Sequence, residues 1–90
     1  MRVARRFLIS GRVQGVGFRY FTEDVATREG VAGWVRNLPD DRVEAYVEGE
    51  TEAVTRVERA LRQGPRGARV DAVDVETQEP SGRYLDFTIR

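Results

Sequence analysis

The chain has 90 residues and a formal net charge of zero; 40% of its residues are hydrophobic and 33% are charged. This length suits one domain with a modest core, so we expect residues 1–90 to form a single domain. The sequence contains no cysteine, which excludes a disulfide framework, a thiol nucleophile and a cysteine-ligated metal. It contains no histidine either, so the usual general base near neutral pH is missing.

No segment has the length or hydropathy of a targeting or membrane sequence. The N-terminal segment offers only Phe7-Leu8-Ile9 as a consecutive apolar run, which is too short for a signal peptide. No stretch approaches the roughly 20 apolar residues of a membrane span. We therefore expect a cytoplasmic protein with no membrane partner. The isoelectric point of about 6.3 argues against a general nucleic-acid binder.

The first half of the chain predicts a strand, a glycine-rich loop, a helix and a β-hairpin. Residues 3–9 alternate as a strand, and residues 19–29 carry apolar side chains at helical spacing, with Gly30 as the C-terminal stop. Residues 31–37 and 43–50 predict two strands joined by a turn. In the second of these strands we expect Val43, Ala45 and Val47 to face inward and Glu44, Tyr46 and Glu48 to face solvent.

The second half predicts a helix and two strands. Thr51 is the expected N-cap of the helix, and the Gly64-Pro65 pair ends it. A strand follows over residues 70–77. The buried stripe of the helix is expected to be Val54, Val57 and Leu61, and a last short strand is expected to alternate Leu85, Phe87 and Ile89.

The order of these elements is β-α-β-β-α-β with one additional terminal strand. Two short helices between strands in this order predict an α+β, ferredoxin-like fold. In that fold an antiparallel sheet carries both helices on one face. No internal repeat or low-complexity linker interrupts the chain.

The loop before the first helix concentrates glycine and arginine. Residues 10–20 read SGRVQGVGFRY and contain three glycines, two arginines and no acid. Glycines allow backbone N–H groups to turn toward one point at a helix N-terminus, where they bind anions. Arg19, in the first helical turn, would add a guanidinium fork suited to phosphate or carboxylate. The alternative is a sharp turn with Arg19 solvated. The spacing matches neither a P-loop nor a dinucleotide-binding motif.

Two segments of the chain resemble the signatures of the acylphosphatase family. Residues 11–19, GRVQGVGFR, are similar to the first signature, and residues 33–37, GWVRN, are similar to the second. The resemblance extends over essentially the whole chain. It implies a hydrolase that cleaves acyl phosphates into carboxylate and inorganic phosphate with no metal or other cofactor. From the chain length we expect a free-standing protein, and from the absence of an obvious apolar surface stripe we expect a monomer. By resemblance, the catalytic residues are Arg19 and Asn37, and the phosphate-binding loop consists of Gly15, Val16, Gly17, Phe18 and Arg19.

The implied reaction is compatible with the missing residue types. The leaving carboxylate is a weak base that needs no general acid, and loose phosphoryl transfer relies on positioning and charge stabilisation. By resemblance, Asn37 positions the attacking water. Its place at the end of a predicted strand, just before Leu38-Pro39, would by itself indicate an ordinary turn residue. Its carboxamide can accept from water and donate to a phosphate oxygen.

Two other functions are compatible with this fold class. One is a catalytically silent module that binds phosphate or carboxylate on the same loop. The other is an RNA-binding module with the same element order, which is disfavoured because the chain lacks the RNP1 pattern and carries Glu44, Glu48 and Glu50 on one strand. We expect the remaining acids, including Asp40, Glu44 and Glu48, to be solvated.

Overall fold

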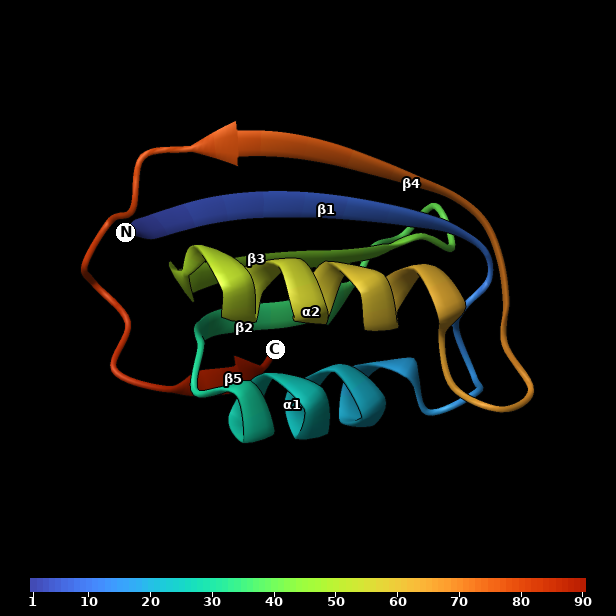
Figure 1. The fold of residues 1–90 in the computed structure, drawn as a ribbon. Coiled ribbons are helices and arrows are strands. Elements are labelled where there is room, and N and C mark those ends of the chain that lie inside the picture. The colour runs from blue at the N-terminus through green and yellow to red at the C-terminus, as the bar shows by residue number, and fades with distance from the viewer.

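Two helices cover one face of a five-stranded sheet in the computed structural model, which describes residues 1–90 (Figure 1). The sheet order is β4-β1-β3-β2-β5. The elements are β1 (Arg2–Arg12), α1 (Phe18–Glu29), β2 (Ala32–Asn37), β3 (Val43–Glu50), α2 (Thr51–Gln63), β4 (Arg69–Gln78) and β5 (Phe87–Ile89).

The predicted ferredoxin-like arrangement is confirmed, with one correction to the sheet. The pairs β4–β1, β1–β3 and β3–β2 are antiparallel, as expected. The terminal strand β5 instead pairs in parallel with β2. The segment after β4 therefore crosses to the far edge of the sheet before β5 begins (Figure 1). The sheet is consequently mixed.

The hydrophobic core lies between the helices and the sheet. Its largest fully buried side chains include Phe7 and Ile9 from β1, Phe18 from α1 and Leu61 from α2. The predicted stripe of α2 is buried throughout. Gly30 ends α1 in a left-handed conformation with φ of 71°, as its position after the helical pattern predicted.

The first strand is longer than predicted and contains one of the three loop glycines. Strand β1 extends from Arg2 to Arg12 because it pairs with both β3 and β4. Its register with β4 shifts between Ser10 and Gly11. Gly11 has φ of 125°, and a Cβ there would lie 2.2 Å from the main-chain oxygen of Arg69. Gly11 thus permits close approach of two strands rather than shaping the loop.

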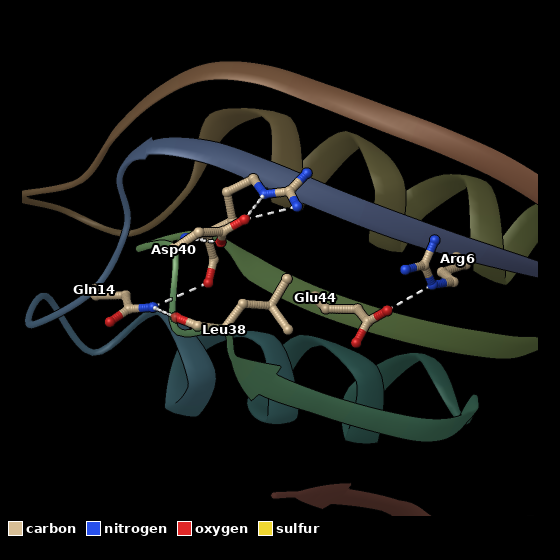
Figure 2. A network of polar contacts seen from close by, with 6 residues as sticks. Arg6, Gln14, Leu38, Asp40 and Glu44 are labelled. Carbon is tan, nitrogen blue, oxygen red and sulfur yellow. Dashed lines mark hydrogen bonds and ion pairs between the residues drawn. The ribbon is translucent and has the colours of Figure 1, made fainter.

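The acids of β3 lie on the face of the sheet opposite the helices, which we call the open face. The expectation that these acids are solvated is wrong. Glu44 is 2% exposed and Glu48 is fully buried. Glu44 accepts hydrogen bonds from Arg6 and Arg36 on the two neighbouring strands, and its contact with Arg6 is drawn in Figure 2. Glu48 is covered by the segment between β4 and β5, where Ser81 donates its main-chain N–H at 2.7 Å.

Two further expectations differ at the ends of elements. Helix α2 begins at Thr51 with Glu50 as its N-cap residue. The Thr51 hydroxyl instead donates to the main-chain oxygen of Met1 at 3.0 Å. Leu85 is 99% exposed and lies outside β5, so of the three alternating residues expected in the last strand, Phe87 and Ile89 belong to it. Neither helix has the length and apolar character needed to cross a membrane.

Candidate active site

The connection between β1 and α1 turns sharply at two glycines. Gly15 and Gly17 both have φ of 75°, a left-handed conformation that side chains disfavour. A Cβ at either position would meet no atom within 4 Å, so the conformation rather than the available space requires glycine. Gly17 is the N-cap residue of α1, and its main-chain oxygen accepts from the N–H of Phe21 at 3.0 Å.

The main-chain N–H groups of this loop are available to a ligand. None of the N–H groups from Gly15 to Tyr20 donates a main-chain hydrogen bond within the protein. The first turn of any helix leaves its N–H groups unpaired, and the helix dipole adds partial positive charge there. Here two left-handed glycines extend that set of donors into the loop. The arrangement is a cradle for an anion.

Arg19 is the second residue of α1 and stands beside the cradle. Its Nη1 donates to the main-chain oxygen of Arg90 at 3.1 Å. Arg90 in turn donates its main-chain N–H to the carbonyl oxygen of Val35 at 2.8 Å, and its guanidinium lies 4.5 Å above the ring of Trp34. The end of the chain is therefore fixed on β2 and orients the Arg19 side chain.

Asn37 is the last residue of β2 and faces the same loop. It pairs with Val43 of β3, so its backbone is fixed by the sheet. The turn that follows closes with a hydrogen bond from the Leu38 N–H to the Arg42 oxygen at 2.8 Å. The Gln14 amide nitrogen donates to both of these residues' main-chain oxygens, at 2.8 and 3.0 Å. Figure 2 shows Gln14 reaching from the loop to this hairpin.

These elements enclose a small pocket of about 180 Å³. It brings Arg19 and Asn37 together although they lie on different elements. Of the predicted loop residues, Val16 does not line the pocket, because its side chain packs against the hydrophobic core. The lining residues are Val13, Gly15, Gly17, Phe18, Arg19, Tyr20 and Asn37.

The electrostatics of the pocket favour an anion. Arg19 is the one charged side chain among its lining residues. The nearest acid in the hairpin sequence, Asp40, accepts from the main-chain N–H and Nε of Arg42, as Figure 2 shows. These hydrogen bonds lower the pKa of Asp40 and occupy its carboxylate. The structure contains no cluster of three or more acids arranged to hold a metal ion.

Three residues of the site were not predicted from the sequence. Gln14 bridges the loop and the hairpin, Arg90 orients Arg19, and Tyr20 lines the pocket. The contact of Gln14 with Leu38 joins residues 24 positions apart, and that of Arg19 with Arg90 joins residues 71 positions apart. A pattern of neighbouring residues therefore cannot predict them. Tyr20 could have been found, because it is a large aromatic residue that directly follows Arg19.

Fold and site together define a ferredoxin-like α+β protein with a small pocket at the N-terminus of its first helix, lined by Arg19 and Asn37. The family model described as acylphosphatase matches residues 5–89. The chain belongs to the acylphosphatase family.

This chain spans nearly the whole length of three similar proteins. The chain is 55% identical over 89 residues to an acylphosphatase of Anaeromyxobacter dehalogenans, covering 99% of this chain and 96% of the relative. It is also 55% identical to an acylphosphatase of Pseudomonas paraeruginosa, with 99% and 97% coverage. Among solved structures, the acylphosphatase from Bacillus subtilis superposes with a TM-score of 0.94 at 35% identity, covering 98% of both chains.

Proposed function

We propose that this protein hydrolyses acyl phosphates without a metal ion, through a phosphoryl group held in the loop and a water molecule positioned by Asn37. Acylphosphatase relatives at 55% identity support the activity. The roles of individual residues follow from the geometry of the pocket. The observation that carries the proposal is the convergence of unpaired loop N–H groups, Arg19 and Asn37 on one 180 Å³ space.

The cradle supplies the electrostatic part of catalysis. The N–H groups of Gly15 to Arg19 donate to the phosphoryl oxygens, and the Arg19 guanidinium donates to them from the side. Because the loop is held by two left-handed glycines and by Gln14, these donors need little reorganisation as charge redistributes in the transition state. Gln14 is therefore a positioning residue.

Asn37 supplies the orientation of the nucleophile. Its carboxamide oxygen accepts a hydrogen bond from water, and its amide nitrogen can donate to a phosphoryl oxygen. The water oxygen forms a bond to phosphorus while the bond between phosphorus and the acyl oxygen breaks. The acyl oxygen leaves as a carboxylate with the electron pair, and the proton of the water passes to the phosphate product or to solvent.

The leaving group explains how a site without a general acid can work. A carboxylic acid has a pKa of about 4, so the departing carboxylate needs no protonation near neutral pH. The chain contains no histidine, cysteine or lysine, and the lining residues of the pocket include no acid. Positioning and charge stabilisation are then the contributions left to the protein.

Two substrates that differ in their leaving group test this proposal. We expect the protein to hydrolyse benzoyl phosphate in the presence of EDTA, followed by ultraviolet absorbance. Phenyl phosphate releases a phenoxide whose acid has a pKa of about 10, and we expect its hydrolysis to be slower by about a hundredfold or more because no general acid is available. Absence of benzoyl phosphate turnover by the folded protein would leave a loop that only binds anions.

We also propose that the protein acts as a cytoplasmic monomer on a small-molecule acyl phosphate, without nucleic acid. The absence of cysteine fits a reducing compartment. Light scattering coupled to size-exclusion chromatography would give the mass in solution, which for a monomer is 10.2 kDa.

A further inference from the structure

Tyr20 is an aromatic residue of the pocket whose ring the proposed reaction does not use. It is 69% exposed and lines the pocket together with Arg19 and Asn37. As the third residue of α1 it is held by a helix rather than by a mobile loop. The helix therefore fixes the position of its main chain relative to the loop N–H groups.

The exposure of Tyr20 is unusual within this protein. The other large hydrophobic side chains that are exposed are Met1, Val75 and Leu85, and none of them lines the pocket. Phe18 and Phe21 pack edge to face, and the remaining aromatic contacts lie on the open sheet face. The ring of Tyr20 takes part in none of these pairs.

The proposed reaction directs the acyl group toward the mouth of the pocket. The pocket has a volume of about 180 Å³, and the phosphoryl group and its attacking water occupy the part of it beside the loop N–H groups and Asn37. The other apolar lining residues, Val13 and Phe18, are 1% and 2% exposed. Tyr20 is therefore the one large apolar surface at the pocket that an acyl group can contact.

We propose that Tyr20 is a specificity-determining residue whose ring packs against the acyl group, so that aromatic acyl phosphates are preferred over acetyl phosphate. This inference rests on the proposed function, because it says which residue contacts the acyl group of the substrate whose phosphoryl group the loop holds. The aryl group stacks on the ring or meets its edge, which are the preferred geometries of aromatic pairs. A methyl group covers little of the ring and gains correspondingly less.

The test compares kcat/KM for benzoyl phosphate and acetyl phosphate in the parent, Tyr20→Ala and Tyr20→Phe. We expect Tyr20→Ala to lower the ratio of benzoyl to acetyl kcat/KM by about three- to tenfold. Tyr20→Phe keeps the ring and is expected to keep the parent ratio. Leu85→Ala removes another exposed apolar side chain, one that does not line the pocket, and serves as the control, with an unchanged ratio.

Several results would overturn the inference. They are an unchanged ratio in Tyr20→Ala, an equal loss of activity toward both substrates, and a change of the same size in Leu85→Ala. Affinities for acetylphosphonate and benzoylphosphonate, measured by NMR titration, repeat the comparison without turnover. A parent that hydrolyses neither substrate would contradict the proposed function, and the ratio of phosphonate affinities would still decide the role of Tyr20.

Discussion

Arg19 presents a planar fork of donors to the pocket, and the structure shows one of them engaged. Its Nη1 bonds to the main-chain oxygen of Arg90, which holds the guanidinium plane while the other donors remain available for a phosphoryl group. A lysine could supply the charge at this position, but it has neither the fork nor the fixed plane. The geometry of the side chain, as well as its charge, is therefore part of the site.

We expect Arg19→Lys to weaken phosphate binding by about tenfold or more, which corresponds to about 1.4 kcal/mol. The inhibition constant for inorganic phosphate measures this directly. Arg12→Lys makes the same change at an exposed residue at the end of β1 and controls for the loss of an arginine outside the pocket. Equal inhibition constants for Arg19→Lys and the parent would show that the fork is dispensable.

The pocket contains no histidine or acidic side chain, so we expect turnover to depend little on pH near neutrality. The chain has no histidine, which is the side chain whose ordinary pKa lies between pH 5 and 8. We expect kcat for benzoyl phosphate to vary by less than about twofold between pH 6 and 8. A bell-shaped profile in this range would instead require a general acid or base that the pocket does not contain.

At the scale of elements, the close approach of a neighbouring strand requires glycine at Gly11 and at Gly33. A Cβ on Gly33 would lie 1.9 Å from the main-chain oxygen of Tyr46, and φ at Gly33 is 140°. Gly33 and Asn37 belong to the same strand, β2, so this close approach also sets where the strand end meets the loop. The requirement is different at Gly15 and Gly17, where a Cβ would meet open space.

Two alanine substitutions separate the requirement for close approach of two strands from the requirement for a left-handed backbone conformation. Gly33→Ala forces two strands apart, and we expect it to lower the free energy of unfolding by more than about 3 kcal/mol. Gly82→Ala adds a Cβ that meets nothing within 4 Å at φ of 68°, so its cost is the backbone conformation alone, about 1 kcal/mol. Urea denaturation measures both, and equal losses would refute the close-approach argument.

Local periodicity accounts for the parts of the fold that were predicted correctly. The stripe of α2 follows helical spacing and is buried on the sheet, and Gly30 ends α1 as a left-handed glycine. The loop and Arg19 could be singled out because the glycines and the arginine lie close together, within residues 10–20. Burial of Glu44 and Glu48 was not predictable, because alternation along β3 cannot reveal that arginines and a distant segment cover that face.

At the scale of the whole molecule, Glu48 joins the centre of the sheet to the segment that precedes β5. It accepts from the Tyr46 hydroxyl at 2.8 Å and from the main-chain N–H of Ser81 at 2.7 Å. Burial alone would raise the pKa of Glu48, but the hydrogen bonds from Tyr46 and Ser81 outweigh it and lower the pKa. This segment leads directly to β5 and Arg90, and hence to Arg19.

This lowered pKa links stability to pH in a definite direction. The carboxylate contributes stability above the ordinary glutamate value of 4.5, and this contribution is lost as the pH falls through the lower value of the folded state. We expect Glu48→Gln to lower the free energy of unfolding at pH 7 by about 2 kcal/mol and to weaken its dependence on pH below 4.5.

The control for this prediction is Glu79→Gln, which changes an exposed acid in the neighbouring segment. We expect it to leave both the stability at pH 7 and the acid dependence close to those of the parent. Urea denaturation between pH 3 and 7 measures all three proteins. Identical curves for Glu48→Gln and Glu79→Gln would show that the buried network contributes nothing specific.

The most direct test of the central claim separates phosphate binding from water positioning in two variants. Phosphate affinity by ³¹P NMR and benzoyl phosphate turnover in EDTA are measured for the parent, Arg19→Ala and Asn37→Ala, with circular dichroism to confirm folding. We expect Arg19→Ala to lose both phosphate binding and turnover. Asn37→Ala is expected to keep phosphate affinity within about threefold while kcat falls by about a hundredfold or more. Near-parental kcat in folded Asn37→Ala would contradict the account.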